Sequence, residues 1–213
     1  MLKFTFILIA FSSTAFSQSL SEKNTLLFNF ITSSSFKQKT FKFYISSIKL
    51  NLSDGSIQEE NTCHLIDQER IESQTIRLNK VHSTDIKSIE FLIGTDSIVN
   101  VSGILDGDLD PIKGMYWAWN SGYVNCKLEG DFTKGTVTYP IELHLGGYSG
   151  SQATAQRVIL PVNSTRNDSL TIDVDPVLLV EQLNLKSQNK VLTPGVKAVE
   201  ISKLLPTIFS LRD

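Results

Sequence analysis

The sequence predicts a mainly β protein, an antiparallel sandwich of two sheets with short C-terminal helices. Over most of the chain, apolar and polar residues alternate with a period of two, which is the pattern of half-buried strands. Turn residues recur at intervals that suit short strands. From Asp175 onward the alternation gives way to helix-start signals. This combination favours a two-sheet sandwich over a closed barrel.

The first 17 residues have the pattern of a secretory signal peptide. Lys3 supplies a positive start, an apolar run follows, and Ala15-Phe-Ser17 is a small-x-small cleavage site. We expect the mature chain to begin at Gln18 and residues 18–213 to form one domain. No later segment approaches the roughly 20 apolar residues that a membrane-spanning helix needs. The sequence therefore predicts an exported protein, periplasmic or secreted.

Nine segments are expected to form strands because their apolar residues alternate between turn signals. Asp54-Gly55 predicts a hairpin turn after the second segment. In the seventh segment the odd positions from Val137 to Leu145 are apolar, so this face is expected in the core, while Glu142 and His144 point the other way. In chain order, the segments are Asn24–Ile31, Thr40–Leu52, Thr62–Asp67, Gln74–Leu78, Ser88–Thr95, Tyr123–Gly130, Thr136–Gly146, Ala155–Leu160 and Ser169–Val174.

Two short helices are expected near the C-terminus. Asp175-Pro176 has the form of an N-cap followed by proline at the first helical position, ahead of Val177–Leu183. Thr193-Pro194 repeats this arrangement ahead of Val196–Leu205.

Charge and cysteine content narrow the functional classes. The net charge is −2 and the basic residues are scattered, so the chain lacks the basic surface of a nucleic-acid-binding protein. The two cysteines, Cys63 and Cys126, could form a disulfide in an exported protein. The sequence leaves a disulfide and two free thiols equally open, since it does not fix the distance between the two residues.

The sequence offers no basis for an enzyme. It contains no Gly-x-Ser-x-Gly motif, and Gly146-Gly-Tyr-Ser-Gly150 has the wrong form and suits a flexible loop. The acidic run of Asp106, Asp108 and Asp110 could bind a hard cation such as Ca²⁺, but the rest of an EF-hand is missing. A solvated turn is the favoured interpretation of this run.

Histidines are the better candidates for a metal site. His144 is expected on the polar face of a well-defined strand, whereas the face of His64 cannot be assigned by alternation. His82 lies in a polar stretch and is interpreted as a solvated loop residue. Two imidazoles with an aromatic or sulfur neighbour would suit copper or zinc better than magnesium or calcium.

Both tryptophans lie in one short segment between residues 109 and 123. If this segment is extended, Met115, Trp117 and Trp119 lie on one face, with same-face neighbours roughly 6.6 Å apart. A Trp-x-Trp pair is ordinarily core packing or a carbohydrate-binding platform.

The same segment, Leu109-Asp-Pro-Ile-Lys-Gly-Met-Tyr-Trp-Ala-Trp-Asn-Ser-Gly-Tyr123, together with Lys127-Leu-Glu-Gly130, closely resembles a conserved block of the MbnP-like copper-binding family. That family carries Leu-Asp-Pro…Gly-Met-x-Trp-x-Trp…Gly-Tyr…Glu-Gly in the same order. The resemblance spans nearly the whole mature chain. Weaker matches are Phe43-Tyr-Ile-Ser46, Leu65-Ile-Asp67, His144-Leu-Gly146 and the C-terminal Leu192-Thr-Pro…Ala198…Ile208-Phe209.

The resemblance implies an exported, β-rich protein that binds copper. In related proteins a partner dihaem enzyme of the cytochrome c peroxidase kind oxidises a tryptophan to kynurenine, which joins histidine in the copper site. Transferred to this chain, the resemblance makes Trp117 and Trp119 the candidates for modification, His144 the leading ligand and His64 a possible second. Trp119 stands where the related copper proteins have a histidine two residues after the modified tryptophan.

The alternative is a cell-surface β-sandwich module that binds a glycan or a protein through an aromatic platform of Tyr116, Trp117, Trp119 and Tyr123. Copper binding requires His144 close to Trp117 or Trp119, whereas a platform requires the rings to be exposed together. A purely structural role predicts that both indoles are buried.

Overall fold

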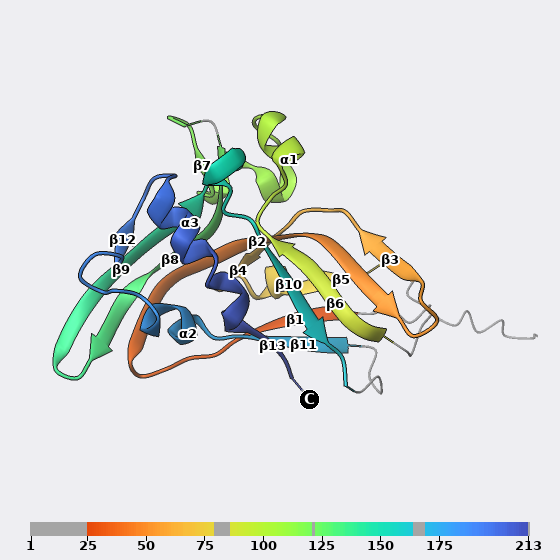
Figure 1. Cartoon of the computed structure of the whole chain (residues 1–213), viewed down its shortest axis with the longest axis horizontal. Coiled ribbons are helices and arrows are strands. Elements are labelled where there is room, and N and C mark those ends of the chain that lie inside the picture. The colour runs from red at the N-terminus through yellow and green to blue at the C-terminus, as the bar shows by residue number, and fades with distance from the viewer. Residues whose placement is uncertain (1–24, 79–85, 121, 164–168, 213) are drawn as a thin grey trace, which may run out of the picture.

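The computed structural model describes residues 25–78, 86–120, 122–163 and 169–212, which form two stacked β-sheets and short helices (Figure 1). The strands are β1 (Thr25–Phe30), β2 (Phe36–Leu52), β3 (Ile57–Glu60), β4 (His64–Asp67), β5 (Thr75–Arg77), β6 (Ile86–Ile93), β7 (Tyr116–Trp117), β8 (Gly122–Lys134), β9 (Val137–Gly146), β10 (Gln156–Pro161), β11 (Ser169–Val174), β12 (Lys190–Val191) and β13 (Phe209–Leu211). The α-helices are α1 (Ser97–Val101), α2 (Pro176–Glu181) and α3 (Val196–Ser202), and the 3-10 helices are η1 (Ile71–Gln74), η2 (Gly107–Leu109), η3 (Pro111–Lys113), η4 (Gly150–Gln152) and η5 (Leu205–Ile208).

The larger sheet is organised around β2. Its strand order is β10-β6-β2-β8-β9-β12, with β3 and β4 also paired to β2 and β7 paired to β8. The first half of β2 pairs with β8 and the second half with β6. The pairing with β6 is irregular between Ser46 and Lys49, where Ser47 has a positive φ of 50°. Such a bulge bends the strand and allows it to serve two neighbours along its length.

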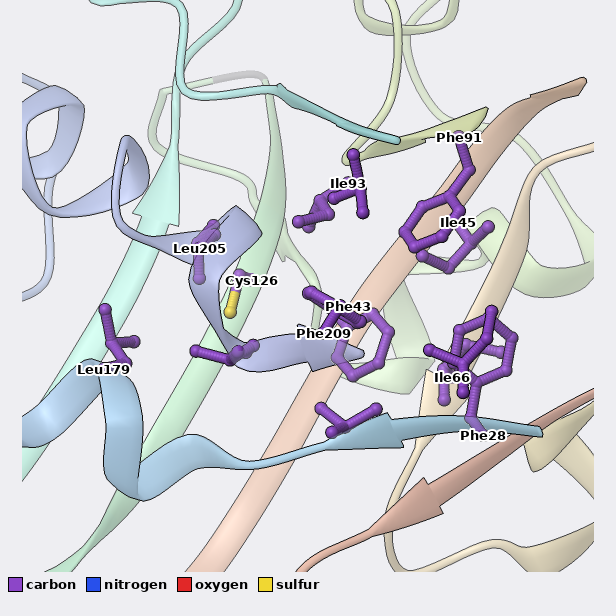
Figure 2. Packing of buried hydrophobic residues seen from close by; sticks show 14 of the residues in the cluster. Phe28, Phe43, Ile45, Ile66, Phe91, Ile93, Cys126, Leu179, Leu205 and Phe209 are labelled. Carbon is purple, nitrogen blue, oxygen red and sulfur yellow. The ribbon is translucent and has the colours of Figure 1, made fainter. Parts of the chain in front are cut away.

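The main hydrophobic core lies between the two sheets and under the C-terminal helices. The smaller sheet has the order β13-β11-β1-β5 and contributes Phe28 and Phe209 to the same cluster as Phe43 and Phe91 of the larger sheet. The ring of Phe43 contacts Phe28 at a centroid distance of 6.1 Å and Phe209 at 5.4 Å, both edge-on (Figure 2). Phe43 therefore joins the two sheets.

A second cluster covers the opposite face of the larger sheet. Side chains alternate along β2, so Tyr44 points away from the face that carries Phe43. Tyr44 packs there with Leu65, Met115, Trp117, Tyr123 and Val124. This outer cluster fixes the tryptophan-containing segment onto the sheet.

The prediction of a mainly β fold with two sheets is confirmed, and most strand pairs are antiparallel as expected, but two pairs are parallel. β1 pairs with β11 in parallel, and β12 pairs with β9 in parallel. Parallel neighbours need a long crossover. The long chain between β1 and β11 supplies one, and local alternation carries no information about so distant a partner.

Most predicted elements are present with shifted ends. β2 begins at Phe36 rather than Thr40, since polar residues at its start pair with β8. The Asp54-Gly55 turn is confirmed: Gly55 has a φ of +87°, and Asp54 accepts a hydrogen bond from the Ser56 amide. Asp175 caps α2 as expected, whereas α3 is preceded by Gly195 instead of the predicted Thr193-Pro194 cap.

Among the α-helices and strands, five were not predicted from the sequence: α1, β3, β7, β12 and β13. Each has five residues or fewer. β3 is mostly polar and pairs only with β2. The predicted signal peptide at residues 1–17 lies outside the described residues. Within the described part of the chain, no helix is long and apolar enough to cross a membrane.

Cys63 and Cys126 are both free thiols in the structure. Cys126 is buried in the main core, whereas Cys63 packs against the outer cluster on the other face of the sheet. Burial raises the pKa of each thiol to about 12. The two thiols are separated by the sheet, so the possible Cys63–Cys126 disulfide is not formed.

Replacing Phe43 with alanine tests the contact between the sheets. We expect Phe43→Ala to lower the free energy of unfolding by about 3–5 kcal/mol, because it leaves a cavity between the two sheets. Urea denaturation measures the loss. The matched control is Ile57→Ala, an exposed position that should change stability by less than about 0.5 kcal/mol. Equal effects of the two substitutions would contradict this account of the core.

Candidate functional site

The two tryptophans lie on one hairpin but differ in exposure. β7 pairs with the start of β8, so that Tyr116 is opposite Tyr123 and Trp117 opposite Gly122. Trp117 is 7% exposed and Trp119 is 65% exposed, with their ring centroids 5.7 Å apart. We expected Met115, Trp117 and Trp119 to share one face. Met115 and Trp117 do so, since both belong to the outer cluster. Trp119 follows the end of β7 and projects into solvent while its ring still contacts Trp117.

A chain of buried side-chain hydrogen bonds holds this hairpin in place. The Tyr123 amide donates to Asn100 Oδ1 (3.0 Å), and Asn100 Nδ2 donates to Thr95 Oγ1 (2.6 Å). The Thr95 amide donates to Asn125 Oδ1 (3.0 Å), and Asn125 Nδ2 donates to Thr154 Oγ1 (3.0 Å). Sequence analysis missed these residues, because buried asparagine and threonine do not differ in sequence from those of ordinary turns. The network ties α1, β8 and the segment after η4 together.

His144 lies on the outer face of β9 in a short contact with Glu129. The distance between His144 Nε2 and Glu129 Oε1 is 2.7 Å, and Lys127 Nζ lies 3.5 Å from the same oxygen. Partial burial opposes ionisation of Glu129, but the hydrogen bond from His144 and the charge of Lys127 outweigh it and lower the pKa of Glu129. A carboxylate accepts hydrogen bonds, so Nε2 is the donor, and in the neutral tautomer with this bond Nδ1 carries the lone pair. A carboxylate that orients an imidazole in this way is the usual partner of a metal-binding histidine.

His144 points to the face of β9 that the Trp117 indole covers at Gly146. Gly146 lies two residues after His144 on this face, roughly 6.6 Å away. A Cβ at Gly146 would lie 2.5 Å from Trp117 Cζ3, so the indole rests directly on the Gly146 backbone. Glu129 is opposite Glu142, on the other side of His144 from Gly146. The Nε2 atom is therefore turned away from the indole.

His64 lies elsewhere. It is opposite Ile45 on the face that carries the main core, whereas His144 is on the outer face. β2 and β8 stand between their strands, so three strand spacings of about 4.8 Å separate them by roughly 14 Å along the sheet. His64 Nε2 is buried without a hydrogen-bond partner. Burial lowers the pKa of His64, and this effect exceeds the opposing influence of Glu60 and Asp108.

The encoded side chains fit a copper ion only in part. Among the residues that the structure describes, no three histidine, cysteine, aspartate or glutamate side chains come together in a way that could hold a metal. His144 offers one nitrogen, and an indole offers no lone pair. The predicted combination of His144 with His64 does not fit, because the two residues lie on opposite faces. His82 lies outside the described residues.

A cavity of about 300 Å³ lies beside β4 and includes His64. Most of its charged groups are paired with one another, as in the contact of 2.9 Å between Lys42 Nζ and Asp67 Oδ2. Asp108 Oδ2 accepts the Leu65 amide (3.0 Å), and Asp110 Oδ1 accepts the Ile112 amide (2.9 Å). The run lies in short 3-10 helices, as the interpretation of a turn expects, and two of its members also bind backbone amides. Neither tryptophan nor His144 lines this cavity.

Gly146→Ala tests whether the indole of Trp117 rests on β9. The new methyl group would meet Trp117 and, at 2.6 Å, the Tyr123 carbonyl oxygen, so we expect a loss of about 1–3 kcal/mol in unfolding free energy and a red-shifted tryptophan fluorescence. Gly122→Ala is the matched control, since its methyl group would find only ordinary contacts at 3.5 Å or more. An unchanged fluorescence spectrum in Gly146→Ala would refute this position of Trp117.

His64 should make stability depend on pH. Its folded pKa lies below that of free histidine, near 6.5, so the unfolded chain takes up a proton first as the pH falls. The free energy of unfolding is therefore constant with respect to His64 above about pH 6.5. Below that pH it falls by at most about 1.4 kcal/mol per pH unit. Urea denaturation between pH 7.5 and 5.5, in steps of about half a unit, measures this slope. His64→Leu should flatten it, and an unchanged slope would show that His64 is not responsible.

Comparison with known proteins identifies the family. The MbnP family model matches residues 6–196. The fold is similar to that of MbnP from Methylosinus trichosporium, with a TM-score of 0.58 and 11% sequence identity over 89% of this chain and 97% of that one. No curated protein matches the chain. The family match covers most of the sequence, including the tryptophan hairpin and His144, and the chain therefore belongs to the MbnP family.

Proposed function

We propose that this protein is an exported, non-enzymatic copper-handling protein whose metal site forms around His144 and Trp117. Membership of the MbnP family supports an association with methanobactin. The observation that carries the proposal is the imidazole of His144, oriented by Glu129 and adjacent to Trp117 on one face of β9. Of the two histidines that the structure describes, only His144 lies on the face of the sheet that carries Trp117.

The proposed site requires oxidation of a tryptophan. Kynurenine replaces the indole N–H by an aniline nitrogen and a carbonyl oxygen, so it supplies ligands that indole lacks. Trp117 is the better candidate because it lies beside His144 and is fixed by the outer cluster. Trp119 contacts the Trp117 ring from solvent and is the second candidate.

Glu129 has a positioning role in this proposal. By accepting the Nε2 proton of His144 it selects the tautomer with a free Nδ1, and it limits rotation of the ring. Binding also requires an unprotonated imidazole, so affinity should fall below about pH 6, where free histidine takes up a proton.

The proposed partner is a dihaem enzyme of the cytochrome c peroxidase kind, which would oxidise the tryptophan. The sequence pattern of residues 1–17 supports export to the periplasm or secretion, where such an enzyme could meet this protein.

An aromatic platform for glycans has less support. Tyr123 is fully buried and Trp117 nearly so, whereas a platform requires rings exposed side by side. Of Trp117, Trp119 and Tyr123, only Trp119 exposes its ring to solvent.

The test is to purify the mature protein from its own host and to measure its copper content together with the mass of the peptide containing both tryptophans. We expect stoichiometric copper and a kynurenine mass shift at Trp117. His144→Ala should lose copper, since it removes the imidazole that lies on the same face of the sheet as Trp117. The matched control is His64→Ala, which should keep copper. Unmodified tryptophan and absence of copper after copper supply would overturn the proposal, and equal loss in both variants would move the site away from His144.

A further inference from the structure

Five exposed apolar side chains lie in the tryptophan hairpin and in the segment that leads to it. Ile98, Val101, Ile104, Ile112 and Trp119, which we call the apolar end, are between 65% and 88% exposed. They are five of the eleven exposed large hydrophobic residues in the described part of the chain. Exposed apolar residues scattered singly are normal, but a group of them marks an interaction site.

Hydrogen bonds at Tyr123 bring together three parts of the apolar end: α1, the segment around Ile104 and the hairpin that carries Trp119. The Tyr123 hydroxyl donates to the Gly103 carbonyl (3.1 Å) and accepts from the Leu105 amide (3.2 Å), which fixes the backbone on both sides of Ile104. The Tyr123 amide binds Asn100 of α1, so α1 lies against the base of the hairpin that carries Trp119 (Figure 1).

The outer side of α1 has no partner within the described structure. Ile98 and Val101 are three residues apart and lie on one side of the helix, exposed to solvent. Val99 and Asn100 face inward, where Val99 packs on the outer cluster and Asn100 holds Tyr123. The exposed residues are thus held on an ordered backbone.

The charge of this region is complementary to a basic partner. Residues 96–120 contain four aspartates (Asp96, Asp106, Asp108 and Asp110) and one lysine (Lys113), which gives a net charge of −4 + 1 = −3. A second copy of the chain would bring the same negative charge to the contact, and an anionic bilayer would repel it. A protein whose apolar patch is ringed by lysine or arginine side chains fits both features.

We propose that the apolar end is the docking surface for a partner protein with an apolar contact patch in a basic rim. This inference rests on exposure and charge and does not depend on the copper site. A partner seated on Trp119 would be one ring contact away from Trp117, since the two centroids are 5.7 Å apart.

Cytochrome c is a suitable probe, because its apolar haem edge is ringed by lysine side chains. The ¹⁵N-labelled mature protein is titrated with it and followed by two-dimensional NMR. We expect amide shifts concentrated in residues 96–123 and a dissociation constant that rises roughly tenfold between about 20 and about 300 mM salt.

Two double variants make the test specific. Ile98→Ser combined with Val101→Ser should weaken binding by roughly tenfold, because both residues lie at the contact. The control combines Ile159→Ser with Val196→Ser, two exposed apolar positions elsewhere, and should bind as the unmodified protein does. Thermal unfolding checks that all variants remain folded.

Several results would overturn the proposal: no binding of cytochrome c at low salt, shifts centred outside residues 96–123, or equal weakening in both double variants. If residues 96–123 bound vesicles containing phosphatidylserine but did not bind cytochrome c, the surface would be assigned to lipid. Concentration-dependent self-association abolished by the first double variant would assign it to a second copy.

Discussion

The structure depends on the burial of β2 on both faces. Most strands of a sandwich bury one face and expose the other, whereas β2 carries Phe43 into the core between the sheets and Tyr44 into the outer cluster. A shift of one residue in its register would exchange the two side chains, so the main core and the outer cluster enforce one register together. The position of the tryptophan hairpin follows from this constraint, because Trp117 and Met115 pack in the cluster that Tyr44 anchors.

Much of the fold could be predicted from the sequence because it rests on local pattern. In β9 the odd residues Ile141, Leu143 and Leu145 are buried as alternation requires, while Val137 at the open end of the hairpin is exposed. Asp175-Pro176 contains the whole cap of α2 within two residues. The parallel pairing of β1 with β11 could not be predicted, since it depends on residues more than a hundred positions apart.

The candidate site shows the same division. Alternation correctly placed His144 on the outer face, and the family resemblance selected the tryptophans. The contact of His144 with Glu129 joins β9 to β8, so it could be recognised only once the register of these two strands was known. For His64, the pairing of Tyr44 with Leu65 sets the face, which puts this histidine on the core side and away from His144. Sequence analysis had no means to see that Trp119 would leave the sheet while remaining in contact with Trp117.

The loop that precedes the tryptophan hairpin also closes an open sheet edge. On the edge of β4 away from β2, the Leu65 amide is bound by Asp108 and the Asp67 amide by Ser73 Oγ (2.9 Å). Unpaired amides on an edge strand can form hydrogen bonds with a strand of another chain. Side chains that accept hydrogen bonds from these amides prevent such pairing. Asp108 therefore has two roles, since it covers part of this edge and fixes the loop that leads to the tryptophans. If this loop came away from the sheet, the indole of Trp117 and a free strand edge would be exposed together.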